Sequence, residues 1–345
     1  MINKSEIKKI FNKKTVLITG GTGSFGSTML NKIKNLNCKI KIFSRDELKQ
    51  DLLRSKIKKD NVDFIIGDIR DKNSIEQAMK GVDIVFHAAA LKQVPSCEFF
   101  PDQATSTNIL GSQNVFNSAI NNQVSKVVAL STDKAVMPIN SMGMTKALME
   151  KILLSKARNA KHKTIFSIVR YGNVIYSRGS VLPLFVNQII QNKKITITNP
   201  KMTRFLISLD DAINLVFVAL KKSNNGDIFI KKSPAATISQ LARCLKEIFR
   251  SKQNSKIIGI RHGEKVYETL ATTNELLTSE NSNEYFKIVI DNRSLNYETY
   301  FDKGSSKELK EDYTSHNTNR LDDSQLKKIL LKIPEINNII KKWIF

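Results

Sequence analysis

Cysteine is scarce in this chain of 345 residues, which contains only three and none in a CxxC spacing. Cys38, Cys97 and Cys244 are far apart and odd in number, which argues against a disulfide framework, a zinc ribbon or a redox dithiol. The four histidines show no HExxH or paired-ligand spacing, so we expect no metal site. Glycine (14) and proline (7) are also few, which excludes collagen-like and low-complexity classes.

Long apolar runs are absent as well. None approaches the roughly 20 residues needed to cross a bilayer, and the N-terminal stretch MINKSEIKKIFNKK has no continuous apolar core like that of a signal peptide. Apolar residues make up 41% of the chain and charged residues 25%, which is within the globular range. We therefore expect a soluble, cytoplasmic protein built as one large domain or two intimate ones.

Acidic residues are outnumbered: 32 Asp and Glu face 55 Lys and Arg, which gives a formal charge of +23. The excess lysines are spread along the whole chain, and no basic block alternates with aromatic residues. We therefore expect no nucleic-acid partner and no membrane insertion. A positive field would still favour an anionic substrate, such as a nucleotide diphosphate.

Short, continuously apolar runs rich in Val, Ile and Phe alternate with amphipathic stretches in the first half of the chain. Such runs are typical of strands covered on both faces, and they occupy residues 15–19, 39–43, 62–66, 83–90, 126–130 and 164–170. The helix-like stretches between them occupy residues 24–35, 71–80, 101–122 and 144–160. This order predicts an α/β fold with a Rossmann-type, doubly wound parallel sheet.

The rhythm changes in the second half, where short strands mix with helices. We assign residues 12–172 to a nucleotide-binding Rossmann domain, with 203–222 returning to it. Residues 173–202 and 223–320 are assigned to a smaller C-terminal substrate-binding lobe, and 321–345 to a pair of C-terminal helices.

A glycine-rich turn with the spacing Gly20-x-x-Gly23-x-x-Gly26 follows the first predicted strand. The glycines permit a tight turn and a close approach of the backbone to a pyrophosphate, which then faces the N-terminus of the next helix. We therefore expect a dinucleotide here. The predicted cofactor contacts in this turn are Gly20, Thr22, Gly23, Ser24, Phe25 and Gly26.

The end of the second strand distinguishes NAD from NADP. An acidic residue directly after that strand would bind the ribose 2′-hydroxyl and repel a 2′-phosphate. Here Ser44 and Arg45 come first, a hydroxyl donor and a fixed cation that suit a phosphate, and this favours NADP. Asp46 follows and leaves NAD as the alternative cofactor. After the third strand, Asp68 is expected to accept from the adenine amino group and to cap the next helix.

Several motifs occur in one order along the chain: TGGTGSFG, FSRDELKQ, GDIRD, HAAALKQVP, STDKA, MGMTK, RYGNV, SRGSVLPLF, MTRFLIS, RHGEK and DYTSHNT. Together they resemble the extended short-chain dehydrogenase/reductases that act on nucleotide sugars. More narrowly, they resemble the soluble, inverting UDP-N-acetylglucosamine 4,6-dehydratase/5-epimerases of capsule and O-antigen synthesis, over roughly residues 12–332. Members of this group are also often labelled UDP-glucose 4-epimerases.

The resemblance implies a reaction with no net oxidation. Tightly bound NADP takes a hydride from carbon 4 of the sugar, and the resulting ketone acidifies the proton on carbon 5. A base removes that proton, an acid protonates the departing hydroxyl of carbon 6, and the hydride returns to carbon 6. Reprotonation of carbon 5 from the opposite face gives a 4-keto-6-deoxy L-sugar. We also expect a homo-oligomer.

The same resemblance assigns roles at the end of the fifth strand. Asp133 and Lys134 match the acid and base, with Thr132 beside them, and Lys146 matches the lysine that binds the nicotinamide ribose. A desolvated Lys134 beside a cationic neighbour is expected to have a lowered pKa, so that it can act as the base.

Met142 departs from the usual pattern, because most short-chain dehydrogenases carry Tyr at that position. A thioether cannot accept the proton of the carbon 4 hydroxyl. Either the proton leaves by Thr132, Lys134 or a water, or the chain is a catalytically silent NADP-binding module. Related soluble dehydratases of the inverting group also carry Met there, which favours the first reading and counts against simple 4-epimerisation.

Further contacts are expected around these groups. His87 is interpreted as a core histidine. Arg204 and Arg261 are suited to hold a diphosphate, because guanidinium offers paired donors, and Glu264 could accept from the uridine ribose hydroxyls. Residues 312–321 are expected to order against a neighbouring subunit. The remaining predicted cofactor contacts are Ile69, Ala88, Ala90, Lys92 and Val174, and the remaining substrate contacts are Lys92, Asn173, Arg178, Gly179, Ser180, Val181 and Leu182.

Overall fold

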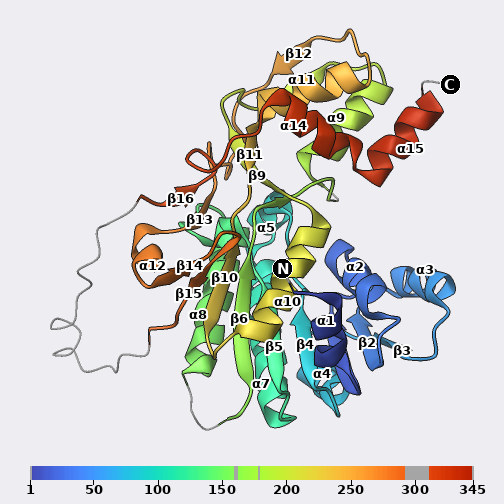
Figure 1. Cartoon of the computed structure of the whole chain (residues 1–345), viewed down its shortest axis with the longest axis vertical. Coiled ribbons are helices and arrows are strands. Elements are labelled where there is room, and N and C mark those ends of the chain that lie inside the picture. Colours follow the sequence, from blue (N-terminus) through green and yellow to red (C-terminus); the bar gives the residue numbers. More distant parts are fainter. Residues whose placement is uncertain (1, 159–161, 178, 292–310, 344–345) are drawn as a thin grey trace, which may run out of the picture.

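A twisted, mostly parallel sheet with helices on both faces forms the larger part of the molecule (Figure 1). The computed structural model describes residues 2–158, 162–177, 179–291 and 311–343. Within these residues the large sheet has nine strands, in the order β14-β15-β10-β6-β5-β4-β1-β2-β3. Its strands are β1 (Lys14–Thr19), β2 (Cys38–Ser44), β3 (Val62–Ile66), β4 (Ile84–His87), β5 (Lys126–Leu130), β6 (Ile165–Arg170), β10 (Asp227–Lys231), β14 (Ser279–Asn281) and β15 (Tyr285–Ile288).

The strands from β10 to β3 run parallel, whereas β15 pairs antiparallel with both β10 and β14. The chain winds outward from β1 in one direction to β3 and in the other, through β4 and β5, to β6. The winding therefore reverses between β1 and β4, and the carboxyl edge at such a reversal is where open α/β sheets bind their ligands.

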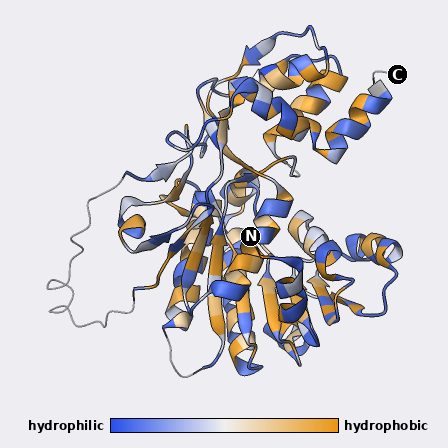
Figure 2. Cartoon of the chain, in the orientation of Figure 1, coloured by the Kyte–Doolittle hydropathy of each residue, from blue (hydrophilic) through white to orange (hydrophobic). Residues whose placement is uncertain are grey.

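Alternate side chains of the central strands point into two separate cores. Val127 and Ala129 of β5 pack on one face, and Val128 and Leu130 pack on the other. Because both faces are covered, the strands read as continuous apolar runs, and Figure 2 shows them as hydrophobic ribbons. The first face carries α4 (Lys72–Met79), α7 (Ser112–Asn121) and α8 (Ser141–Ala157); the second carries α1 (Lys4–Phe11), α2 (Ser24–Ile33), α3 (Glu47–Ile57) and α10 (Leu209–Lys222).

A smaller lobe lies over the carboxyl edge of the sheet and contains the C-terminal helices (Figure 1). Its core joins α9 (Val181–Ile190), α11 (Ile238–Ile248), α14 (Asp323–Leu331), α15 (Pro334–Trp343) and β8 (Ile195–Ile197). Three short sheets complete it and connect it to the rest: β7 (Asn173–Val174) with β9 (Thr203–Ile207) and β11 (Ala235–Thr237), β12 (Ser255–Ile257) with β8, and β13 (Thr269–Ala271) with β16 (Tyr313–Thr314).

The predicted doubly wound α/β fold is confirmed, but the chain is divided differently from our expectation in one respect. Strands β10, β14 and β15 lie in the large sheet, although 223–320 was assigned to the smaller lobe. The reason is that β10 is apolar on both faces, with Ile228 and Ile230 in one core and Phe229 in the other. Such a strand needs helices on both sides.

Two helical regions also differ from expectation. Helix α3 was not predicted, because its sequence ELKQDLLRSKI buries only two residues, Gln50 and Ile57. The single helix expected over 101–122 is divided into α6 (Pro101–Ala104), a π-helical segment η1 (Thr105–Gly111) and α7. Across the described ranges, no helix combines the length and apolar content needed to cross a membrane.

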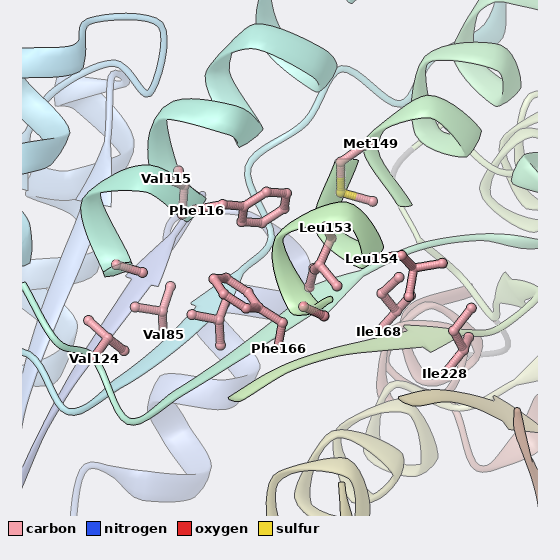
Figure 3. Close-up of a cluster of buried hydrophobic side chains, with 14 of the residues drawn as sticks. Val85, Val115, Phe116, Val124, Met149, Leu153, Leu154, Phe166, Ile168 and Ile228 are labelled. Carbon is pink, nitrogen blue, oxygen red and sulfur yellow. The ribbon is translucent and has the colours of Figure 1, made fainter. Parts of the chain in front are cut away.

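Aromatic rings fill the centre of the first core (Figure 3). Phe116 of α7 and Phe166 of β6 are fully buried and meet edge to face, with ring centroids 5.8 Å apart. Met149 and Leu153 of α8 belong to the same cluster. This packing fixes β5 and β6, whose carboxyl ends form part of the site described below.

Phe166→Ala is expected to lower the free energy of unfolding by about 3–5 kcal/mol, because it leaves a cavity beside Phe116. Denaturant unfolding monitored by circular dichroism measures this loss. Leu52→Ala is the control, since Leu52 is 50% exposed on α3, and it should cost under about 1 kcal/mol. Equal losses for the two variants would contradict the assignment of this core.

Candidate functional site

A cavity of about 1280 Å³ lies between the carboxyl edge of the large sheet and the smaller lobe. It extends from the glycine turn after β1 to residues 261–265 of the lobe. Pockets for a single small molecule usually measure about 300–1,000 Å³, so this cavity has room for more than one ligand. Its place, at the reversal of strand order between β1 and β4, is the one expected for a nucleotide.

Nearly all of the predicted site residues line this cavity. Leu182 does not, because it is 2% exposed on the apolar face of α9 in the core of the smaller lobe. Arg178 lies outside the described residues. Those that line the cavity are Gly20, Thr22, Gly23, Ser24, Phe25, Gly26, Ser44, Arg45, Asp46, Asp68, Ile69, Ala88, Ala90, Lys92, Thr132, Asp133, Lys134, Met142, Lys146, Asn173, Val174, Gly179, Ser180, Val181, Arg204, Arg261 and Glu264.

The glycine turn has the geometry of a dinucleotide cradle. Gly20 has a φ of +65°, and a Cβ there would lie 2.8 Å from the backbone of Ala89. A Cβ on Gly26 would lie 2.5 Å from the backbone of Gly21. Helix α2 begins after Gly23, which supplies no capping side chain, and its first turn has no acidic residue. Its open N–H groups and the positive end of its dipole therefore fit a pyrophosphate.

The end of β2 is held against this turn. Thr22 Oγ1 donates to Ser44 Oγ at 3.1 Å. Asp46 caps α3, where its carboxylate accepts from the backbone N–H of Lys49 at 3.0 Å and also pairs with the Lys49 ammonium. The Arg45 side chain is 53% exposed at the cavity. A hydroxyl, two cations and the carboxylates of Asp46 and Asp68 thus gather at this end of the cavity.

Asp68 has a different structural role from the one expected. Asp71, and not Asp68, caps α4. The Asp68 carboxylate instead accepts from the Arg70 guanidinium at 2.6 Å and lies 3.5 Å from Arg45. Burial alone would raise the pKa of Asp68, but the hydrogen bonds from Arg70 and the charges of both arginines hold it below its usual value. Asp68 is therefore a charged acceptor at the cavity wall.

One turn of 3-10 helix, η2 (Asp133–Ala135), follows β5 and carries the predicted acid–base pair. Thr132 caps this turn: its Oγ1 accepts from the Lys134 backbone N–H at 3.3 Å and donates to Asp133 Oδ1 at 2.8 Å. Lys134 Nζ lies 3.1 Å from Asp133 Oδ1. The Asp133 side chain is 1% exposed and that of Lys134 is 21% exposed.

Glu268 completes this cluster, and the sequence reasoning missed it. Its Oε1 lies 3.3 Å from Lys134 Nζ, and its side chain is 3% exposed. Glu268 directly precedes β13 and belongs to none of the motifs quoted above. Only the fold brings it beside a lysine 134 positions earlier in the chain. Asp133 Oδ2 and Glu268 Oε2 are both buried without a hydrogen-bond partner among the described residues.

The charges of this cluster correct our expectation for Lys134. Burial opposes the ammonium form, but the carboxylates of Asp133 and Glu268 outweigh burial and hold the pKa of Lys134 above its ordinary value. Burial, reinforced by the charge of Asp133, raises the pKa of Glu268. The expected lowering was wrong because it left out a second carboxylate: the cationic neighbour Arg204 does lower the pKa of Lys134, but Asp133 and Glu268 together outweigh it.

Lys146 and Met142 lie one turn apart on α8. Lys146 Nζ donates to the backbone oxygen of Leu130 at 2.7 Å, and burial lowers the pKa of Lys146 to about 8. Met142 is buried against Cys97 and Ala104. The position that a tyrosine usually occupies in this family therefore presents a thioether to the cavity wall.

His87 is a satisfied core residue, as predicted. Its Nδ1 is 2.8 Å from Thr19 Oγ1 and its Nε2 is 2.9 Å from Ser112 Oγ. Burial, together with the charge of Lys146, lowers the pKa of His87 to about 3. The ring is therefore neutral at physiological pH.

The substrate side of the cavity is tied together by Arg204. Its Nη2 donates to the backbone oxygen of Lys265 at 2.9 Å, its Nη1 donates to that of Thr203 at 2.8 Å, and its Nε lies 3.6 Å from Glu268 Oε1. Arg261 is exposed at the cavity, and its backbone N–H lies 3.4 Å from Glu264 Oε2. Arg261 thus has a guanidinium that is more open to a ligand than that of Arg204.

The segment around Ser315 packs against its own chain. Ser315 Oγ accepts from the backbone N–H of Glu268 at 2.9 Å, and the backbone N–H of Ser315 donates to the backbone oxygen of Glu268 at 2.8 Å. Thr203 Oγ1 lies 2.7 Å from both Ser315 Oγ and His316 Nδ1. These contacts fix the backbone from which the Glu268 carboxylate projects.

A doubly wound sheet, a glycine-rich turn at its reversal point and a lobe over its carboxyl edge define an α/β protein of the Rossmann type. The chain belongs to the polysaccharide biosynthesis protein family, whose model matches residues 16–290. The model for the C-terminal part of that family matches residues 291–337.

Named relatives cover almost the whole chain. It is 54% identical over 340 residues to a protein of Rickettsia bellii (strain RML369-C) named UDP-glucose 4-epimerase, covering 96% of this chain and 99% of the relative. The protein of the same name from Rickettsia rickettsii (strain Sheila Smith) is 52% identical over 339 residues, with the same two coverages.

Solved structures show the same fold. Pen from Bacillus thuringiensis is similar with a TM-score of 0.85 and 36% identity, covering 94% of this chain and 100% of Pen. DesIV from Streptomyces venezuelae, a dTDP-glucose 4,6-dehydratase solved with NAD and TYD bound, has a TM-score of 0.67 at 20% identity, covering 73% of this chain and 86% of DesIV.

The burial of Lys146 has a measurable consequence for stability. Its folded pKa is about 8, against an ordinary value of 10.5. Between these values the unfolded chain holds a proton that the folded chain has lost, so this group makes stability rise with pH. The Lys146→Met variant lacks this titrating group. The wild-type free energy of unfolding minus that of the variant should be constant below pH 8 and rise by up to about 1.4 kcal/mol per pH unit above it. Denaturant titrations across pH 6–10 test this, and parallel curves would refute it.

Proposed function

We propose that this protein is a UDP-N-acetylglucosamine 4,6-dehydratase with 5-epimerase activity, which forms a 4-keto-6-deoxy L-sugar nucleotide for capsule or O-antigen synthesis. The observation that carries this proposal is the buried Asp133–Lys134 pair at the cavity, with Nζ and Oδ1 3.1 Å apart. Elimination across two adjacent carbons needs one group that takes a proton and another that gives one. Met142, which can do neither, fits elimination better than a reaction that depends on a phenol.

The cofactor side of the proposal rests on the glycine turn and the cations after β2. NADP, when bound, would supply reversible oxidation at carbon 4 of the sugar. The N-terminus of α2 would hold its pyrophosphate, and Ser44, Arg45 and Lys49 would hold its 2′-phosphate. Lys146 would donate to the nicotinamide ribose and keep a positive charge near the reacting carbon.

The remaining steps are proton transfers by side chains of this chain. Once carbon 4 is a ketone, the carbon 5 proton is acidic enough for the Lys134 amine to remove it. Asp133 then delivers a proton to the hydroxyl that leaves carbon 6. Carbon 5 takes up a solvent proton from the opposite face, and the proton on Lys134 returns to solvent. Thr132, which donates to Asp133 at 2.8 Å, offers a route for the carbon 4 hydroxyl proton toward Asp133.

A second candidate function is UDP-glucose 4-epimerase, which the names of the Rickettsia relatives favour. That reaction removes and returns the carbon 4 hydroxyl proton in both directions, so it depends on a well-placed acid–base group at this hydroxyl. Met142 supplies none. We therefore place 4-epimerisation second.

Product NMR in deuterated water tests the dehydratase proposal. With UDP-N-acetylglucosamine we expect a 6-deoxy signal and solvent deuterium at carbon 5, because the new proton reaches carbon 5 from the face opposite Lys134 and is not the one that Lys134 removed. Lys134→Ala should lose turnover at least 100-fold and keep its NADP affinity. Formation of UDP-N-acetylgalactosamine, or of UDP-galactose from UDP-glucose, would assign the 4-epimerase instead. Cofactor binding without turnover of any UDP-sugar would indicate a silent module.

Cofactor choice is tested at Arg45. Arg45→Ala should weaken NADP binding roughly 10- to 100-fold and leave NAD binding nearly unchanged, because only NADP carries the phosphate that the guanidinium would pair with. Calorimetric titration of both cofactors measures this difference. Arg54→Ala is the matched control, since Arg54 lies over the Phe64 ring, away from the cavity. An equal loss for both cofactors at Arg45 would show that it does not read the 2′-phosphate.

A further inference from the structure

Glu268 is a buried carboxylate at the cavity that the proposed proton transfers do not use. Its Oε1 lies 3.3 Å from Lys134 Nζ. Its Oε2 is buried with no hydrogen-bond partner in the described part of the chain. Ser315 forms hydrogen bonds with both the backbone N–H and the backbone oxygen of Glu268. These two bonds hold Glu268 in place beside Lys134.

Four charged groups surround the Glu268 carboxylate and form a cluster of five with it. Asp133 and Lys134 come from η2, Arg204 from β9, and Lys265 and Glu268 from the chain before β13. Two carboxylates and one ammonium are in direct contact, which leaves one excess negative charge. Arg204, 3.6 Å from Glu268 Oε1, and Lys265 offset it. With all five groups ionised their charges sum to +1, and a proton passed from Lys134 to Glu268 stays among them, so the transfer leaves this sum unchanged.

The chemistry of Lys134 creates a need for such a proton acceptor. An ammonium cannot remove a proton from carbon, and the raised pKa of Lys134 keeps it an ammonium at neutral pH. Burial and the charge of Asp133 raise the pKa of Glu268, which makes its carboxylate a better acceptor than an exposed one. A bound substrate displaces water from the cavity, and a drier site favours a neutral amine and acid over an ion pair.

We propose that Glu268 takes up the proton of the Lys134 ammonium and so converts Lys134 into the neutral base of the dehydratase. The Nζ–H bond breaks, an Oε1–H bond forms, and Lys134 keeps the electron pair with which it removes the carbon 5 proton. Glu268 acts through Lys134, so it is a positioning residue. This inference rests on the proposed dehydratase function.

The pH profile of Glu268→Gln tests this transfer. The amide cannot accept the proton, so Lys134 must lose it to solvent. We expect kcat on UDP-N-acetylglucosamine to fall about 100- to 1,000-fold at pH 7 and to recover about tenfold per pH unit toward the ordinary lysine pKa. Wild type should show no such rise between pH 7 and 9, where the loss of charge from Lys146, whose pKa is about 8, can only lower kcat. Glu268→Asp should be slower than wild type, with the same profile.

The controls separate this role from a structural one. Glu280→Gln changes an exposed carboxylate, 65% exposed and paired with Lys287, and should leave kcat unchanged. The proposal would be overturned if the kcat of Glu268→Gln falls and does not recover at alkaline pH. It would also be overturned if this variant keeps the wild-type kcat. If Glu268→Gln does not fold, Glu268→Asp is the test: a profile like that of wild type supports the proposal, and a tenfold rise in kcat per pH unit overturns it. A wild-type protein that forms no 6-deoxy product would refute the proposed function itself.

Discussion

Two buried carboxylates, Asp133 and Glu268, enclose the single ammonium of Lys134 where the large sheet meets the smaller lobe. Removing three charged groups from water is costly, and their mutual attraction offsets that cost only if all three stay in contact. The elements that supply them come from opposite halves of the chain: β5 leads into η2, and β13 pairs with β16. The attraction among these charges therefore offsets the cost of burying them only when the smaller lobe is docked on the large sheet.

The same region buries charged side chains at positions that the proposed reaction uses. Lys146 is buried against a backbone oxygen, and its pKa falls to about 8 as a result. One carboxylate oxygen each of Asp133 and Glu268 has no hydrogen-bond partner among the residues that the structure describes. Buried polar groups without partners are rare in well-packed proteins and are concentrated where a ligand supplies the missing contact. The rigid aromatic core around Phe116 and Phe166 keeps the neighbouring strands in place despite these groups.

The sequence predicted the parts of this structure that depend on local pattern. Continuous apolar runs identified the parallel strands, and the Gly20–Gly26 spacing identified the cradle. It did not predict β15, because antiparallel pairing with β10 joins segments some 55 residues apart. Glu268 and the pKa of Lys134 were missed for the same reason: the charges that surround Lys134 are set by long-range packing. Leu182 was misplaced because family resemblance does not say which face of a helix is buried.

Proteins similar to this chain carry both epimerase and dehydratase names, and fold alone does not separate the two reactions. The distinction lies in which atoms of the sugar the charged cluster reaches. A crystal structure with NADP and UDP-N-acetylglucosamine bound measures this directly. Our account predicts carbon 5 of the pyranose beside Lys134 Nζ and the carbon 6 hydroxyl within hydrogen-bonding distance of Asp133. A pyranose bound away from both side chains would contradict it.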